Sequence, residues 1–192
     1  MQIALFGGRF DPVHNGHLAI AREILKVVSS VDEVWFVPDN QHHWNPTVAS
    51  VEDRFALLHL VEEPNIKVSD IGIQVASFRK GKTFVIDIIR ELQKKTKNTY
   101  LFIAGSDQIT RFHEWIDYDE LLMRLPFLIF PRKGYVLNGS LPHNCLWLSD
   151  KTFIPLEDSA TRIREKLKKG ESIAGLVSKK VEKYIKEHRL YV

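Results

Sequence analysis

The sequence is poor in cysteine, with Cys145 alone among 192 residues. A single cysteine excludes an intramolecular disulfide and a cysteine-rich zinc site, and it fits a reducing compartment best. The chain also lacks a basic or apolar leader at its start, and it has no apolar run of the roughly 20 residues that a membrane-spanning helix needs. We therefore expect a cytoplasmic protein that has no membrane partner.

A strong charge of one sign is absent as well. The formal net charge is +3 with 27% charged residues, and the excess of lysine and arginine lies in the last third of the chain. This mild basic bias suits ligands that carry phosphate, but it is too diffuse for a nucleic-acid groove. The sequence has no repeat or linker, and 192 residues with 44% hydrophobic content suit one well-buried core. We expect residues 1–192 to form a single domain.

Short apolar runs alternate along the chain with longer segments of helical period. This pattern predicts strands at 2–6, 34–37, 66–68, 101–104, 127–130 and 153–154. It predicts helices at 16–28, 51–61, 84–95, 118–125, 159–168 and 179–187. The order indicates an α/β fold of the Rossmann-like kind, a parallel sheet with helices on both faces and ligands at the carboxyl ends of the strands. The longest polar interruption, residues 38–49, is predicted to form a mobile flap.

The stretch GGRFDPVHNGH, residues 7–17, lies between the first strand and the first helix. Gly7 and Gly8 have no Cβ, so the backbone can turn sharply there and approach a bulky anion closely. The helix that begins near Gly16 offers free N–H groups and the positive end of its dipole. These features predict a phosphate cradle, although a tight turn that packs the strand on the helix also explains the glycine pair.

Two histidines accompany these glycines. His14 precedes the helix and His17 follows three residues later, a spacing that places both side chains over the first helical turn. Two hydrogen-bond donors to one phosphate is the simplest use of such a pair. The alternatives are a helix cap at His14, a partly buried His17 and a two-histidine metal site, for which no third ligand lies nearby at metal-binding spacing.

These residues carry a family resemblance. GRFDPVHNGH resembles the H-x-G-H signature of the nucleotidyltransferase superfamily, and DSATRIREKLKKG, residues 158–170, resembles its second signature, a Ser-Ser-Thr-x-Ile-Arg box that opens a helix. Between them, TFVIDIIREL, YLFIAGSDQITRFHEWIDYDELL and FLIFPRKGY are similar to the middle of bacterial nicotinate-mononucleotide adenylyltransferases. Pantetheine-phosphate adenylyltransferases and small cytidylyltransferases share the first signature, so the Gly-Ser-Asp and Phe-His-Glu-Trp stretch favours the nicotinate branch.

The resemblance implies transfer of AMP from ATP to nicotinate mononucleotide, which gives deamido-NAD and pyrophosphate in NAD biosynthesis. A phosphate of the mononucleotide attacks the α-phosphorus of ATP, so catalysis needs positioning and charge stabilisation and no protein nucleophile. The resemblance further implies Mg²⁺ that is bound with the ATP phosphates and held largely by phosphates and water, without a protein cage. The implied partners are ATP and a pyridine mononucleotide, and a homo-oligomer is left open.

The resemblance also assigns roles to single residues. The catalytic residues that it implies are His14, His17 and Arg164, with His17 the more essential histidine. The ATP-binding residues that it implies are Gly7, Gly8, Phe10, Gly16, Gly105, Asp107, Ser159 and Thr161. The mononucleotide-binding residues that it implies are Arg9, Trp115 and Arg132, with Asp11 and Lys133 as weaker candidates. The alternatives are core packing for Trp115 and, in the second signature, an ordinary N-cap followed by solvated arginines at 162 and 164.

Three departures from the family pattern affect these assignments. Arg9 stands where the bacterial nicotinate branch usually has a small hydroxyl residue, and Gly-Arg-Phe is more similar to the nicotinamide-mononucleotide branch. In the flap, at residues 40–46, His43 matches the family histidine but Trp44 replaces a lysine, and Ala160 replaces the second serine of the later box. The alternative activity is therefore a nicotinamide-mononucleotide or dual-substrate adenylyltransferase, ahead of a pantetheine-phosphate adenylyltransferase or a noncatalytic nucleotide sensor.

Overall fold

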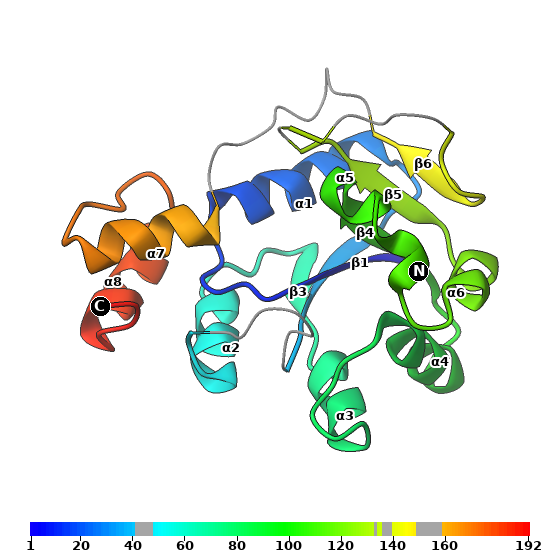
Figure 1. Ribbon diagram of the computed structural model, residues 1–192, viewed down its shortest axis with the longest axis horizontal. Coiled ribbons are helices and arrows are strands. Elements are labelled where there is room, and N and C mark those ends of the chain that lie inside the picture. The colour runs from blue at the N-terminus through cyan, green and yellow to red at the C-terminus, as the bar shows by residue number, and fades with distance from the viewer. Residues whose placement is uncertain (41–47, 133, 136–139, 149–158) are drawn as a thin grey trace.

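A six-stranded parallel sheet in the order β3-β2-β1-β4-β5-β6 forms the centre of the protein. The computed structural model describes residues 1–40, 48–132, 134–135, 140–148 and 159–192 (Figure 1). The strands are β1 (Gln2–Gly8), β2 (Glu33–Pro38), β3 (Ile66–Val68), β4 (Thr99–Gly105), β5 (Phe127–Phe130) and β6 (Cys145–Trp147). Strand β1 lies between β2 and β4, so the direction of winding reverses there. The carboxyl ends of β1 and β4 therefore border the topological switch point where α/β sheets bind ligands.

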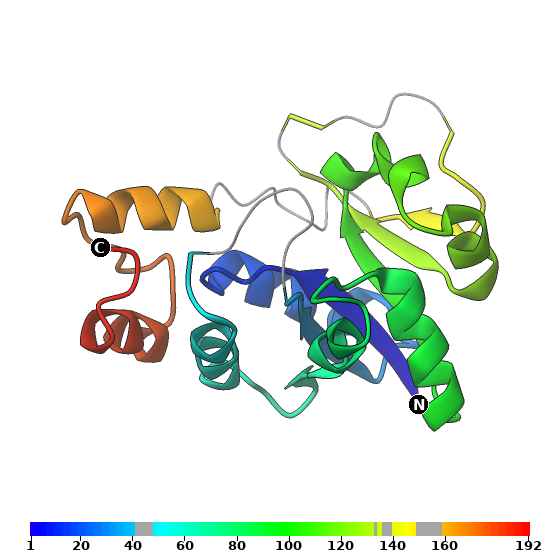
Figure 2. The same ribbon diagram turned by 60° about the horizontal axis from the view of Figure 1, so that its bottom comes forward.

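Helices cover both faces of this sheet (Figure 2). They are α1 (Asn15–Val27), α2 (Val51–His59), α3 (Ile71–Ser77), α4 (Val85–Lys95), α5 (Ser106–Ile109), the 3₁₀ turn η1 (Phe112–Glu114), α6 (Tyr118–Arg124), α7 (Ala160–Lys168) and α8 (Lys179–Glu187). The expected Rossmann-like α/β fold is confirmed. No helix in the described part of the chain has the length and apolar character to cross a membrane.

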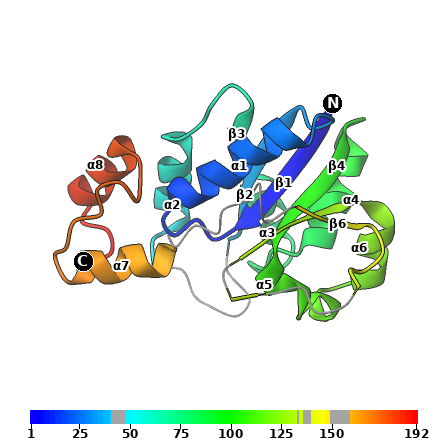
Figure 3. The ribbon, with the colours of Figure 1, turned by 90° about the horizontal axis from the view of Figure 1, so that it is seen from above.

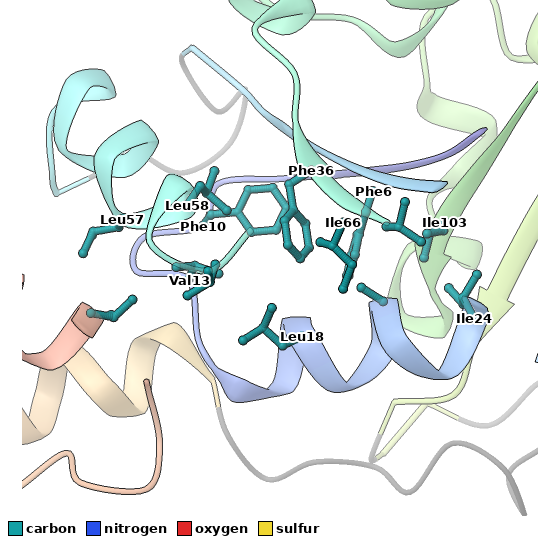
Figure 4. Packing of buried hydrophobic residues seen from close by; sticks show 14 of the residues in the cluster. Phe6, Phe10, Val13, Leu18, Ile24, Phe36, Leu57, Leu58, Ile66 and Ile103 are labelled. Carbon is teal, nitrogen blue, oxygen red and sulfur yellow. The ribbon is translucent and has the colours of Figure 1, made fainter. Parts of the chain in front are cut away.

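Two hydrophobic cores follow from the alternation of side chains along the strands. In β1, Ala4 and Phe6 enter a first core with α1, α2, α7 and α8. Ile3 and Leu5 point the other way, into a second core with α3, α4 and α6. Figure 4 shows the first core, in which Phe6, Phe10, Phe36 and their neighbours pack above Leu18 of α1. Phe10 and Val13 anchor the turn between β1 and α1 in this core.

Most predicted elements agree with the structure to within two residues, and the differences have local causes. The predicted strand at 153–154 lies outside the described residues, and the sixth strand of the sheet is β6, an edge strand of three residues. Helix α3 was not predicted because it is short and contains Gly72, a poor helix former. A Cβ at Gly72 would lie 2.7 Å from the Pro38 carbonyl oxygen, so packing against the end of β2 requires glycine there.

Candidate active site

The turn after β1 is made by residues 9–12 and not by the glycine pair. Gly7 and Gly8 are still part of β1 and pair with β2. A Cβ at Gly7 would lie 2.7 Å from Cζ of Phe102, so this glycine makes room for a core ring. The chain leaves β1 after Gly8 and turns at Asp11 and Pro12, directly after Phe10, whose φ is 50°. The prediction that the glycines make the sharp turn is therefore wrong, and their approach to a phosphate stays a prediction.

His14 and His17 cap the start of α1 with their own rings. His14 Nδ1 accepts a hydrogen bond of 3.1 Å from the Gly16 N–H, and His17 Nδ1 accepts one of 3.2 Å from the His14 N–H. The ring centroids lie 3.8 Å apart. Because each Nδ1 is an acceptor, the neutral ring carries its proton on Nε2, which makes each Nε2–H a donor. Helix capping and ligand binding thus use different nitrogens of the same ring.

The backbone amides at this helix start are already paired. The Gly16 and His14 amides donate to the two imidazoles, and the Asn15 N–H donates to the Leu176 carbonyl oxygen at 2.9 Å. The prediction of free N–H groups near Gly16 is therefore wrong. Hydrogen-bond donors for an anion come instead from the histidine Nε2 atoms.

Burial keeps both imidazoles neutral near pH 7. Desolvation, with a smaller contribution from the positive charge of Arg132, lowers the pKa of His14 from 6.5 to about 4. Desolvation, the neighbouring His14 and Arg132 together lower the pKa of His17 well below 6.5. The Phe10 ring packs edge-on against His17 at a centroid distance of 4.9 Å and contributes to this apolar setting. The pair therefore offers two neutral hydrogen-bond donors.

The ends of β4 and β5 bring Asp107 and Arg132 together. A Cβ at Gly105 would clash with Asp107 Oδ1 and lie 2.8 Å from Arg132 Cδ, so a larger residue there would displace these two side chains from the strand end. Arg132 Nη1 lies 3.6 Å from Asp107 Oδ2, and Ser106 Oγ accepts a hydrogen bond of 2.9 Å from the Arg132 N–H. Asp107 Oδ1 is buried and has no partner among the described residues. This oxygen is therefore an acceptor whose lone pairs are not used by the described residues.

Helix α7 reaches the turn after β1 through Arg164. Its Nη1 donates a hydrogen bond of 2.6 Å to the Asp11 carbonyl oxygen, and its Nη2 donates one of 3.1 Å to Thr161 Oγ1. Ser159 is the N-cap of α7, and its Oγ accepts a hydrogen bond of 3.2 Å from the Arg162 N–H. The N-cap interpretation is thus right for Ser159. Arg164, however, lies against the turn that carries the histidines.

Trp115 packs against aromatic rings of the second core. Its ring lies nearly perpendicular to Phe112 and Phe102, at centroid distances of 4.8 and 5.8 Å. Part of the Trp115 ring is therefore packed in the core, as the core-packing alternative for this residue predicts. The indole Nε1 is buried and has no partner among the described residues. Such an unpaired donor leaves a ligand contact open.

The other predicted residues have mixed outcomes. The Phe10 ring is buried in the first core, so only its backbone is left to meet ATP. Arg9 is partly buried and follows directly on β1. Lys133, His43 and Trp44 lie outside the described residues.

Sequence reasoning missed Arg54, a fully buried arginine on α2. Its Nη1 donates a hydrogen bond of 2.8 Å to the Arg9 carbonyl oxygen, and its Nη2 donates one of 3.1 Å to that of Asn40. Arg54 therefore joins the turn after β1 to the chain that leaves β2. The available signal was its position on the apolar stripe of the helix, three and four residues before Leu57 and Leu58.

The fold and this site together define a class. The protein is an α/β protein with a parallel sheet, and two neutral histidine donors and an arginine lie near its switch point, the kinds of donor that phosphate oxygens accept. Residues 5–166 match the Cytidylyltransferase-like family, and the chain belongs to this family of nucleotidyltransferases.

Similar proteins cover the whole chain. A nicotinate-nucleotide adenylyltransferase of Bacillus subtilis is 33% identical over 195 residues, with 99% of this chain and 98% of that protein covered. A protein of Shouchella clausii, named a probable nicotinate-nucleotide adenylyltransferase, is 37% identical over 198 residues, with 99% and 96% covered. The structure of Plasmodium falciparum nicotinic acid mononucleotide adenylyltransferase complexed with NaAD matches with a TM-score of 0.78 and 19% identity over 99% of this chain and 97% of that one. The family resemblance seen in the sequence is confirmed.

The lowered pKa of His14 makes stability depend on pH. Between pH 6.5 and about 4 the unfolded chain binds a proton at this residue that the folded chain does not. The free energy of unfolding therefore decreases as the pH is lowered through that window. We expect His14 to contribute a loss of about 1 kcal/mol per pH unit there. His14→Gln keeps an acceptor for the Gly16 N–H but does not titrate. Urea unfolding at about pH 7 and about pH 5 should show a shallower loss in this variant, and equal slopes would contradict the buried neutral ring.

Proposed function

We propose that this protein transfers AMP from ATP to nicotinate mononucleotide and releases deamido-NAD and pyrophosphate. The observation that carries the proposal is full-length similarity to nicotinate-nucleotide adenylyltransferases at more than 30% identity. The two imidazole donors at the switch point of the sheet support it. We further propose that residues 1–192 act as one nucleotidyltransferase domain in the cytoplasm, where the single cysteine fits a reducing environment.

In the proposed reaction the histidine pair acts on the group that is transferred. A phosphate oxygen of the mononucleotide attacks the α-phosphorus of ATP in line, and the bond to pyrophosphate breaks. The Nε2–H groups of His14 and His17 donate to the oxygens of this phosphoryl group while charge builds on them. Both rings are held in place by their Nδ1 hydrogen bonds, so the donors need little reorganisation during the reaction.

Helix α7 is proposed to hold the leaving group. Arg164 uses one N–H of each Nη atom on Asp11 and Thr161, and a guanidinium has five N–H donors, so three are left for the β and γ phosphates. The Ser159 and Thr161 hydroxyls and the first amides of α7 add further donors. Gly7, Gly8 and Gly16 are proposed to let the phosphates approach the backbone.

Mg²⁺ is proposed to arrive with ATP. The buried, unpartnered Asp107 Oδ1 fits a water on this ion, because Mg²⁺ prefers oxygen ligands and keeps several waters. Among the described residues no group of three histidine, cysteine, aspartate or glutamate side chains is placed to hold an ion. Phosphates and water would complete the coordination. When bound, the ion neutralises charge on the leaving pyrophosphate.

The mononucleotide is proposed to lie over the ends of β4 and β5. Arg132, which stands 3.6 Å from Asp107, and Arg9 are cations for its phosphate. Trp115, a half-buried residue whose Nε1–H is unpaired among the described residues, is proposed to meet the pyridine.

Replacement of His17 tests the role of the histidine pair. His17→Ala removes one Nε2–H donor, and we expect kcat to fall by about 10²- to 10³-fold or more while the fold is kept. The control is His59→Ala, which removes an exposed histidine of α2 that pairs with Glu62. Pyrophosphate release measures both variants. A His17→Ala enzyme within tenfold of the wild type would remove this residue from the mechanism.

Replacement of Arg164 tests the leaving-group site. Because hydrogen bonds to charged groups are worth about 1.5–3 kcal/mol, Arg164→Ala should raise the KM for ATP about tenfold or more and change the KM for the mononucleotide little. Arg164→Lys keeps the charge but loses the planar fork and should recover only part of the loss. Arg162→Ala, on the exposed side of α7, is the control. An unchanged KM and rate for ATP in Arg164→Ala would indicate that Arg164 does not bind the ATP phosphates and belongs to a solvated face of the helix.

The acceptor is decided by a comparison of specificity constants. Nicotinate and nicotinamide differ by a carboxylate against an amide, so discrimination depends on whether the pocket offers donors alone or a donor and an acceptor. We expect a higher kcat/KM for nicotinate mononucleotide, by about tenfold or more, with measurable activity on the amide. A preference for nicotinamide mononucleotide would show that Arg9, which favours that substrate, is a better guide to specificity than Trp115, which favours nicotinate. ATP binding without pyrophosphate release from any acceptor would indicate a noncatalytic sensor.

A further inference from the structure

A buried carboxylate, Asp11, joins four segments of the chain around the proposed site. It is 1% exposed. Its Oδ2 accepts a hydrogen bond of 2.7 Å from the Val48 N–H, and its Oδ1 accepts one of 3.1 Å from the Ala49 N–H. Its carbonyl oxygen accepts the Arg164 hydrogen bond described above. The Tyr191 hydroxyl, which follows α8, donates a further bond of 2.9 Å to Oδ1.

The backbone is strained on both sides of the Asp11–Tyr191 contact. Tyr191 has a φ of 68°, and Phe10, the neighbour of Asp11, has a φ of 50°. Bulky residues rarely adopt this left-handed region and stay there only where the surrounding structure compensates. The Tyr191 side chain is 6% exposed and packs in the first core, which includes Phe10 and Val13. Burial and the adjacent carboxylate raise the pKa of Tyr191, so its hydroxyl stays protonated and donates.

The same turn sets the direction of the residues that are proposed to bind phosphate. Asp11 lies three residues before His14, in a turn that is held by core packing of Phe10 and Val13 and by the hydrogen bond from Arg164 of α7. Figure 3 shows α7 and α8 side by side at the end of the molecule where this turn enters α1. A shift of Asp11 would therefore move both the histidine pair and the carbonyl group that orients Arg164.

We propose that Tyr191 is a positioning residue for nucleotidyl transfer, and that it acts through its hydrogen bond to Asp11 Oδ1. The proposal rests on the proposed function. Tyr191 is not a catalytic residue, because its one hydroxyl proton is used on Asp11 and its ring is buried in the core. Its effect is to hold the turn in the geometry in which His14, His17 and Arg164 meet the ATP phosphates together.

The chain contains a matched control for this bond. Tyr184 of α8 also donates its hydroxyl to an aspartate, Asp53 Oδ1 of α2, at 3.0 Å. Asp53 is hydrogen-bonded to Ser50, the N-cap of α2, and among the described residues no hydrogen bond or ion pair joins it to the turn at residues 9–12. Tyr184→Phe and Tyr191→Phe therefore remove the same group from the same pair of residue types. Only Tyr191→Phe removes a hydrogen bond to Asp11, the residue in the turn that leads to the histidines.

The first experiment compares these two variants with the wild type, with Mg·ATP and nicotinate mononucleotide as substrates. We expect Tyr191→Phe to lower kcat about tenfold and to weaken binding of Mg·ATP alone, because small displacements of reacting groups cost large factors in rate. Tyr184→Phe should keep kcat within twofold, whatever its effect on Tm. Equal kcat values in both variants, or a Tyr191→Phe effect on Tm alone, would show that Tyr191 serves stability only. An inactive wild type would overturn the proposed function instead.

A double-mutant cycle tests the path through Asp11. Asp11→Ala removes the acceptor of the tyrosine hydroxyl together with those of the Val48 and Ala49 N–H groups, so it should also lower kcat. If Tyr191 acts through Asp11, the loss in Asp11→Ala/Tyr191→Phe is smaller than the product of the two single losses. Independent, multiplicative losses would contradict the proposal. Should Tyr191→Phe fail to fold, an unchanged kcat in Asp11→Ala overturns the proposal; should Asp11→Ala fail to fold, the comparison of Tyr191→Phe with Tyr184→Phe decides.

Discussion

The candidate site depends on one kind of hydrogen bond, in which the Nδ1 atoms of His14 and His17 each accept a backbone N–H. These two bonds close the N-terminus of α1, fix the rotation of each ring and assign the remaining proton to Nε2. A helix start usually offers its amides to an anion directly. Here the Nδ1 atoms of the imidazoles accept hydrogen bonds from two of those amides, and the Nε2–H groups are the donors that remain. The same two rings therefore cap the helix and form the candidate site.

Two buried polar side chains next to the site, Arg54 and Asp11, make hydrogen bonds that offset part of their desolvation. Arg54 is fully buried and donates to two carbonyl groups, and Asp11 accepts two amides and a phenol. These residues tie the turn after β1 to β2, α2, α7 and the segment after α8. A site made from loops thereby gains a fixed geometry, which catalysis by positioning requires.

Sequence reasoning succeeded where the periodicity of one segment was sufficient. The apolar runs of β1, β4 and β5 and the amphipathic stripes of α4 and α8 depend on neighbours in sequence, and these elements agree with the structure. It failed at the glycines of β1 and at the amides of α1. The reason Gly7 is glycine is the ring of Phe102, on another strand, and the partner of the Asn15 amide is Leu176. Neither contact leaves a local pattern.

The sequence by itself determined the class of fold and the kinds of side chain that gather at the switch point, because parallel strands bring their carboxyl ends to one edge. The H-x-G-H stretch and the second signature were visible as residues in order. The tertiary structure decided which atoms are available, since it leaves Nε2 rather than Nδ1 of each histidine as a donor. It also decided that Arg164 and Tyr191, both far from Asp11 in sequence, donate hydrogen bonds to that residue. Hydrogen bonds between distant segments depend on how those segments pack, and packing is a property of the whole fold.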